Sequence, residues 1–109
     1  MRLFLALVFA SLAFGQTTRT VVVTWDDLLN PVGTTYAVYR ADGPCSATPA
    51  FVKIADAVAK TYTDTAVVTG NRYCYTVTAI LNTLESDQSN TALAAVKPFP
   101  PGKVDGVVK

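Results

Sequence analysis

The most regular alternation of apolar and polar residues runs over residues 72–80, directly after a Gly-Asn turn signal. Aromatic and β-branched side chains recur there with a period of two, which is typical of a half-buried β-strand. One set is predicted to face a core and the other to face water: Tyr73, Tyr75, Val77 and Ala79 against Cys74, Thr76 and Thr78. We expect this segment to be the central strand of a β-sandwich.

Shorter strands are predicted on both sides of it, at residues 21–25, 34–40, 51–54, 60–65 and 91–96. The last of these is rich in Ala, but six residues between polar segments are too few for a stable helix. Turn residues mark 26–33, 41–44 and 82–90 as turns or polar loops, and 55–59 is expected to be irregular or weakly helical. Short strands between turn signals, without a long helical period, predict an all-β antiparallel sandwich.

The N-terminal segment has the layout of a secretory signal peptide. Arg2 precedes an apolar run at residues 3–14, and Ala13 and Gly15 stand at the −3 and −1 positions of a cleavage site before Gln16. The apolar run is too short to span a bilayer, which takes about 20 residues. The alternatives are an uncleaved membrane anchor or a buried N-terminal helix. We expect a secreted protein, extracellular or periplasmic, with no membrane span after cleavage.

Composition limits the chemistry that the chain can support. Its 109 residues suffice for one domain, and a formal net charge of +1 without a basic run argues against a nucleic-acid partner. There is no His, which removes the commonest general base and the commonest metal ligand. We therefore expect no enzymatic activity and no cofactor.

Two groups of acidic residues are candidate sites. Asp26 and Asp27 could bind a cation together with Asn30, but Ca²⁺ requires six to eight oxygen ligands and no recognisable ligand spacing is present. Glu85 and Asp87 could be paired carboxylates, but their loop is rich in Ser and Asn and has no neighbouring aromatic cleft. Solvated loops are the favoured interpretation of both. In a sandwich the two loops would lie together at one pole, which is where we expect any ligand surface.

Five motifs occur in an order and spacing that resembles a fibronectin type III domain of the bacterial secreted kind. They are Val-Thr-Trp at 23–25, Tyr-Ala-Val-Tyr-Arg at 36–40, Tyr-Thr-Asp-Thr at 62–65, Tyr-Cys-Tyr-Thr-Val-Thr-Ala at 73–79 and Glu-Ser-Asp-Gln-Ser-Asn at 85–90. The resemblance covers residues 21–97 and implies an immunoglobulin-like sandwich. Residues 1–15 are then a signal peptide, 16–97 the domain, and 98–109 a Pro-rich linker and C-terminal tail.

The resemblance implies structural roles for the aromatic residues. Trp25 would be a core residue, Tyr36 and Val38 would point inward, and Tyr73 would bond the backbone upstream through its hydroxyl, as in a tyrosine corner. Tyr75 and Val77 would fill the core; an aromatic ligand platform is the less favoured alternative. The departure from the family is at the front, where residues 16–20 are too few for a regular strand A. The tail at 100–108 resembles a Pro-led strand A instead.

The same topology implies that the two cysteines are neighbours. Cys74 would face outward near the start of its strand, at the pole where the turn that contains Cys45 lies. A secreted chain with two cysteines favours a disulfide. Two free thiols are the alternative, and a metal site or a catalytic thiol is disfavoured without His.

The sequence favours two functions. The first is a secreted, non-enzymatic binding or adhesion module for a protein or polysaccharide surface. The second is a structural subunit whose tail, residues 103–109, adds as a strand to the exposed edge of a neighbour. The tail could instead be a disordered end, the start of a following domain, or a segment that folds back on its own domain.

Overall fold

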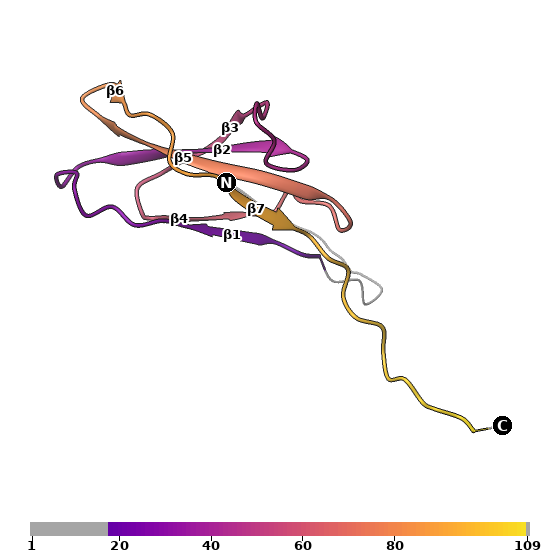
Figure 1. Ribbon diagram of the computed structural model, residues 1–109. Coiled ribbons are helices and arrows are strands. Elements are labelled where there is room, and N and C mark those ends of the chain that lie inside the picture. Colours follow the sequence, from indigo (N-terminus) through magenta and orange to yellow (C-terminus); the bar gives the residue numbers. More distant parts are fainter. Residues whose placement is uncertain (1–17, 109) are drawn as a thin grey trace.

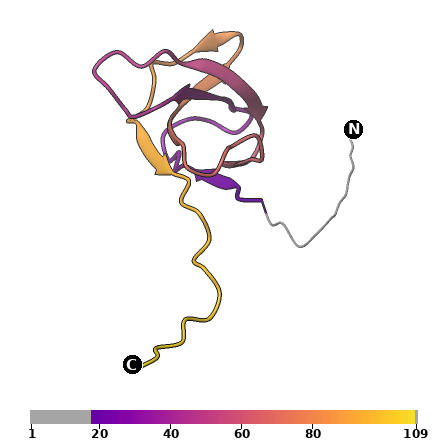
Figure 2. The same cartoon turned by 90° about the vertical axis from the view of Figure 1, so that its right-hand side faces the viewer.

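The computed structural model describes residues 18–108 and shows an all-β protein built from two antiparallel sheets that face each other (Figures 1 and 2). The predicted signal peptide lies outside the described residues. The strands are β1 (Val21–Thr24), β2 (Thr35–Asp42), β3 (Val52–Ala57), β4 (Thr61–Asp64), β5 (Arg72–Leu81), β6 (Leu84–Glu85) and β7 (Ala92–Ala95). β1 pairs with β4, and the larger sheet runs β3-β2-β5 with β6 and β7 both paired to β5. The predicted all-β antiparallel architecture is confirmed.

The core lies between the sheets and follows the predicted period of two. Tyr36 and Val38 of β2 are buried together with Tyr73, Tyr75 and Val77 of β5. The smaller sheet covers them with partly buried side chains from β1 and β4: Val21, Val23 and Tyr62, with Trp25 just beyond β1. Because β5 is paired along both edges, it is the central strand of the larger sheet, as predicted.

The outer face of β5 differs from the prediction. Cys74, Thr76 and Thr78 were expected to face water, but each is at most 4% exposed. The Thr76 hydroxyl donates to the Ser89 carbonyl at 3.0 Å, and the Thr78 hydroxyl donates to the Glu85 carboxylate at 2.6 Å. A central strand has neighbours on both sides, so short side chains on its outer face are covered by them, and hydrogen bonds offset the cost of burial.

Two loop predictions were also wrong in part. Residues 55–57 belong to β3, where Ala55 pairs with Val38, so ladder pairing with β2 overrides the helical preference of Ala. Within 82–90, Asn82 and Thr83 both have positive φ and form a two-residue turn into β6, which the polar composition concealed.

The start of β5 is fixed by an aromatic and a sulfur side chain. The Tyr73 hydroxyl accepts a hydrogen bond from the Val68 amide at 2.8 Å, which is the upstream contact that the resemblance implied. The structure joins Cys45 and Cys74 in a disulfide, with Cα atoms 5.1 Å apart. Such a bond is compatible with an extracellular or periplasmic location. Within residues 18–108 no helix is long and apolar enough to cross a membrane.

A buried ion pair crosses the interior between the sheets. Asp64, at the end of β4, is 2% exposed and accepts hydrogen bonds from Arg40 Nη1 at 3.0 Å and from the Tyr75 hydroxyl at 2.7 Å. The Ala66 amide donates to its second oxygen at 3.0 Å. Burial alone would raise the pKa of Asp64, but the hydrogen bonds from Tyr75, Arg40 and Ala66 outweigh it and lower the pKa.

Breaking this pair is expected to destabilise the protein. Asp64→Ala leaves the Tyr75 hydroxyl without its acceptor and leaves the Arg40 guanidinium with only the Ala66 carbonyl and the exposed Asp42, and we expect the free energy of unfolding to fall by about 3–5 kcal/mol. The matched control is Asp42→Ala, because Asp42 also pairs with Arg40, at 3.4 Å, but is 78% exposed. The control should cost under about 1 kcal/mol. Denaturant unfolding of the oxidised protein measures both, and equal losses would contradict the assignment.

The disulfide should stabilise mainly through the loop that it closes. Cys45 and Cys74 are 29 residues apart, and for a loop of that length the chain-entropy model gives roughly 3–4 kcal/mol. We expect the Cys45→Ala, Cys74→Ala double variant to lose about this much stability in chemical denaturation. Adding a reductant should then lower the stability of the parent protein but leave the variant unchanged.

Candidate ligand-binding pocket

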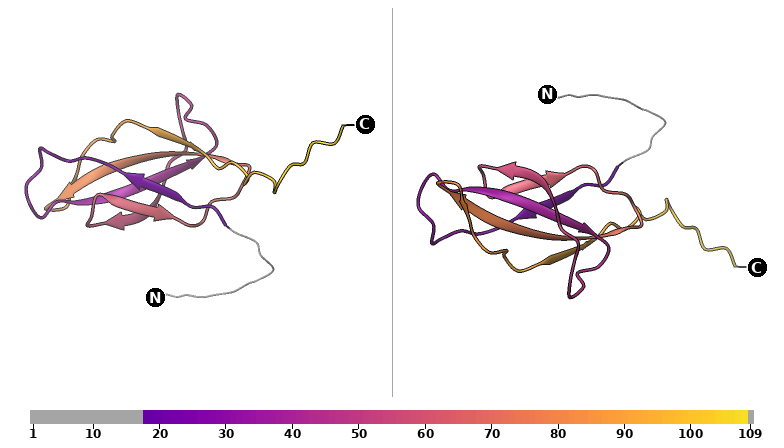
Figure 3. Two further views of the ribbon diagram at one scale, coloured as in Figure 1. Left: turned by 90° about the horizontal axis from the view of Figure 1, so that it is seen from below. Right: turned by 90° about the horizontal axis from the view of Figure 1, so that it is seen from above.

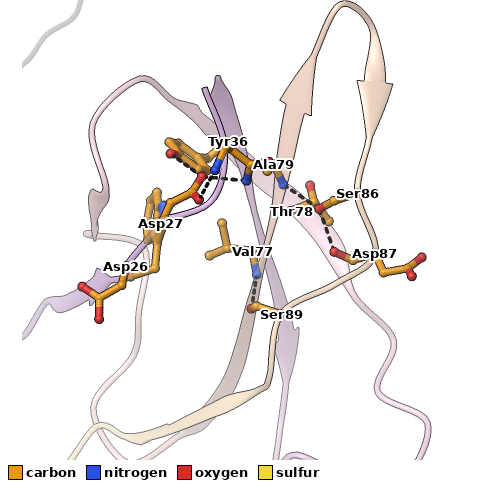
Figure 4. Close-up of a pocket in the computed structure, with 11 residues that line it drawn as sticks. Asp26, Asp27, Tyr36, Val77, Thr78, Ala79, Ser86, Asp87 and Ser89 are labelled. Atoms are coloured by element: carbon orange, nitrogen blue, oxygen red, sulfur yellow. Dashed lines mark hydrogen bonds between the residues drawn. The ribbon is translucent and has the colours of Figure 1, made fainter. Parts of the chain in front are cut away.

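The two polar segments that were expected to meet at one pole do so. The loop after β1 and the segment after β6 flank a pocket of about 210 Å³ at the end of the sandwich where β1 ends and β2 begins (Figure 4). The lining residues come from the first loop and β2, from β5, and from the second segment: Trp25, Asp26, Asp27, Asn30 and Tyr36; Val77, Thr78 and Ala79; Ser86, Asp87 and Ser89.

Asp27 organises the first loop. One carboxylate oxygen accepts the amides of Leu29 and Asn30 at 3.3 and 3.1 Å, and the other accepts the Asn30 side-chain amide and the Tyr36 hydroxyl, both at 2.8 Å. Lys60 Nζ donates to the Asp27 backbone carbonyl at 3.2 Å. An Asp that binds the backbone two and three residues ahead is a common device for closing a turn. Because Tyr36 is anchored in β2, Asp27 also fixes the loop to the larger sheet.

These contacts set the protonation of both partners. Hydrogen bonds from the side chains of Asn30 and Tyr36 lower the pKa of Asp27 to about 2, and the same bond to Asp27 raises the pKa of Tyr36. At neutral pH Asp27 is therefore ionised and Tyr36 is protonated. A carboxylate offers about four acceptor positions, and four donors already occupy those of Asp27. The residue shapes the pocket and has no free lone pair for proton transfer.

The second wall is shaped by two serines that bind β5. The Ser86 hydroxyl accepts the Ala79 amide at 2.9 Å, and the Ser89 hydroxyl accepts the Val77 amide at 3.1 Å (Figure 4). In return, the amides of Ser86 and Ser89 donate to the carbonyls of Ala79 and Val77. Each serine thus satisfies both backbone groups of one β5 residue.

The residues between the serines form a bulge. Ile80 pairs with Glu85 and Tyr75 pairs with Ala92, so five steps along β5 correspond to seven steps along the opposite segment. Two extra residues must leave the ladder between β6 and β7. Asp87 lies in this stretch and is exposed at the rim of the pocket.

The aromatic wall contains an unused hydrogen-bond donor. Trp25 and Tyr36 pack edge to face, with ring centroids 5.4 Å apart. Trp25 Nε1 is buried and has no acceptor among residues 18–108. Buried indole N–H groups usually find a partner. This N–H group is therefore enclosed by protein. Two exposed carboxylates, Asp26 and Asp87, lie on opposite sides of the pocket, at its rim (Figure 4).

The other acidic candidates do not form a chemical site. Within residues 18–108 no group of three or more His, Cys, Asp or Glu side chains is arranged to hold a metal ion. Glu85 accepts hydrogen bonds from Tyr39 and Thr78 and does not line the pocket, so the structure does not bring it together with Asp87. These two hydrogen bonds, first from Thr78 and then from Tyr39, also lower the pKa of Glu85.

The sequence pointed to the loops but not to the residues that shape them. The roles of Tyr36, Ser86 and Ser89 were missed. For Tyr36 the signal was its place at the start of an inward-facing series, beside a loop that contains an Asp. For the serines it was their spacing of three after a strand, which suits a bulged partner strand.

The Tyr36–Asp27 bond can be tested through the pKa of the carboxyl group. In Tyr36→Phe we expect the pKa of Asp27 to rise from about 2 toward its ordinary value, because one donor to the ionised form is lost. Because the pKa of Asp27 is lower in the folded state than in the unfolded state, where it is ~4, the ionised carboxylate stabilises the folded protein at pH values above ~4. This stabilisation is lost as the pH falls through the pKa of the folded state. Carboxyl ¹³C titration by NMR measures the change. Tyr39→Phe, which removes the bond to Glu85 instead, should leave Asp27 unchanged.

No known family model matches the sequence, and no characterised protein shows significant similarity to it.

Proposed function

We propose that the chain is a secreted, non-enzymatic binding module with a single fibronectin type III-like domain, and that it recognises a polysaccharide surface through the pocket between its two polar segments. The strand pairing supports this domain type, because β1–β4 and β3–β2–β5 with β7 match the arrangement of the later strands of such a sandwich, and residues 18–108 include no strand before β1. The Tyr73–Val68 hydrogen bond adds to that support.

One observation carries the proposal: two segments about 60 residues apart in sequence converge on one pocket that carries exposed carboxylates at its rim. These are Asp26 and Asp87, which lie on opposite sides of the pocket (Figure 4). The support beneath them is rigid, because Asp27 and the two serines tie the walls to β2 and β5. A preformed concave site with a few convergent polar groups is what a binding pocket requires.

The geometry favours sugar hydroxyl groups as the ligand chemistry. A sugar hydroxyl group donates hydrogen bonds, so the hydroxyls of a sugar can donate to the exposed carboxylates at the rim of the pocket. The residues of the pocket do not suit catalysis. Asp27 has its acceptor positions occupied by four donors, and the serines that line the pocket are bonded to the backbone of β5.

The test replaces both exposed carboxylates of the pocket in one double variant and measures binding. A panel of soluble bacterial and plant polysaccharides is screened, and the best binder is titrated calorimetrically against Asp26→Asn, Asp87→Asn. Hydrogen bonds to charged groups contribute about 1.5–3 kcal/mol each, so we expect affinity to fall by at least about tenfold.

The matched control is Asp42→Asn, Asp56→Asn, which removes the same charge from two exposed residues that do not line the pocket. The control should bind like the parent, with native mass checked for all three proteins. Equal losses in both double variants would place binding elsewhere. Cleavage of any polysaccharide by the purified chain would overturn the proposal.

A further inference from the structure

One edge of the smaller sheet has no strand beside it in the described part of the chain. β1 pairs only with β4 among residues 18–108. The Trp25 amide donates to the Lys60 carbonyl at 3.1 Å, so in the antiparallel alternation Val21 and Val23 also direct their backbone groups toward β4. The amides and carbonyls of Val22 and Thr24 therefore face the open edge, where they can pair with a further strand.

Hollows run along this open side, between β1 and the segment that ends in β7. One, of about 360 Å³, lies between residues 23–26 of the first sheet and residues 75–77 and 89–92 of the second. The other, of about 220 Å³, lies between residues 19–21 and 95–97. Val23, Tyr75 and Val77 give the first an apolar wall, and Val21 and Val96 do so in the second. A strand laid along the β1 edge would cover both.

The C-terminal tail, residues 98–108, is an extended segment that lines neither of these two hollows. Residues 98–108 leave the body after β7 and run away from it (Figures 1 and 3). Their apolar side chains are exposed, with Val104 at 82%, Val107 at 71% and Val108 at 99%. The start of the tail is held by Arg19, which donates to the Pro98 carbonyl at 3.4 Å and lies 3.7 Å from the centre of the Phe99 ring.

We propose that the tail of a second copy of this chain adds to β1 as an antiparallel strand and fills the two hollows. Strand direction selects a second copy over the chain's own tail. The own tail leaves at the pole where β1 begins, since residues 19–21 and 95–97 line one hollow. To reach the β1 edge it would have to reverse and run parallel to β1. The tail of a neighbour that enters at the opposite pole, where β1 ends, runs antiparallel to it.

The tail sequence fits one register. Residues directly opposite each other in an antiparallel pair point to the same face, so inward tail residues must lie opposite Val21, Val23 and Trp25. Placing Val104 opposite Trp25 brings Gly106 opposite Val23 and Val108 opposite Val21. The two valines then enter the two hollows. Gly106, between them, carries no side chain that would need room against Val23.

The outward positions of this register are also complementary. Lys103 falls opposite Asp26, an exposed carboxylate at the pole where the tail enters. Val107 falls opposite Val22, which is 60% exposed. The interface is heterologous, because one copy contributes a tail and the other an edge. Such contacts make open chains unless the rotation between copies closes a ring.

Two variants of the full chain separate the donor from the acceptor. Val104→Asp places a carboxylate in the larger hollow and disables the tail as a donor. Val22→Pro removes an amide that faces the open edge and leaves the β4 ladder intact, which is a position where an edge strand tolerates Pro. Native mass is measured by light scattering over a concentration series of the oxidised protein. We expect the parent to grow in mass with concentration, and each variant alone to remain a monomer.

Mixing the two variants is the decisive experiment, because each supplies the part that the other lacks. Mixed together, the Val22→Pro chain still has a tail and the Val104→Asp chain still has an edge, so the mixture should form a 1:1 heterodimer and nothing larger. Val107→Asp is the matched control, because it makes the same substitution three residues away on the outward face. It should assemble within about threefold of the parent, whereas Val104→Asp should weaken assembly by at least about tenfold.

Each contrary result overturns the inference. These results are a parent that stays monomeric at all concentrations, a Val104→Asp chain that assembles like the parent, and a mixture that stays monomeric. Circular dichroism checks whether Val22→Pro is folded. If this variant is unfolded, a synthetic peptide of residues 99–108 is titrated into the Val104→Asp chain instead. NMR shifts at residues 21–26 are then expected, and their absence counts against strand addition.

Discussion

The buried carboxylate of Asp64 is the contact on which the arrangement of the two sheets depends. A two-stranded sheet is at best marginally stable by itself, so β1 and β4 persist because they pack on the larger sheet. Asp64 ends β4 and is bonded to Arg40 of β2 and Tyr75 of β5, which sets where the smaller sheet lies along the larger one. A misplaced register would leave the buried Asp64 carboxylate without its partners, which costs several kcal/mol. The pair is therefore a positional constraint as well as a source of stability.

Most of the fold could be predicted because its strands carry a strong period of two. Tyr36 and Val38, and Tyr73, Tyr75 and Val77, face the core as the alternation required. The same alternation places Arg40 on the inward face with Val38, and Asp64 on the inward face with Tyr62. The ion pair between them was not predicted, because charged residues are ordinarily expected at the protein surface. The alternation does not show which residues cover the outer face of β5. Thr76 and Thr78 are buried there because β6 and the segment after it lie beside them and bind their hydroxyl groups.

The candidate pocket was predictable in place and not in detail. Polar loops that precede β2 and follow β6 must share a pole in any antiparallel sandwich of this order, which is topology and needs no side-chain information. The pocket itself depends on Asp27 reaching Tyr36 and on two serines replacing ladder partners of β5. Such local side-chain-to-backbone bonds leave only weak traces in a sequence, because Asp and Ser are common in every polar loop.

Strand addition at β1 would stabilise the smaller sheet, which is the less stable of the two sheets by itself. Among residues 18–108 the smaller sheet has two strands, and a tail from a neighbour would add a third while covering Val21 and Val23. The energy gained on association is then partly folding energy of the acceptor, since a ligand that binds only the native state shifts unfolding by mass action. The Pro residues at positions 98, 100 and 101 restrict the first part of the tail to extended conformations, and this stiff part carries the strand-forming residues 103–108 away from their own domain. Residues 103–108 contain no Pro, so the entropy lost when they become ordered opposes assembly, and the burial of Val104 and Val108 together with the new strand pairing must exceed it.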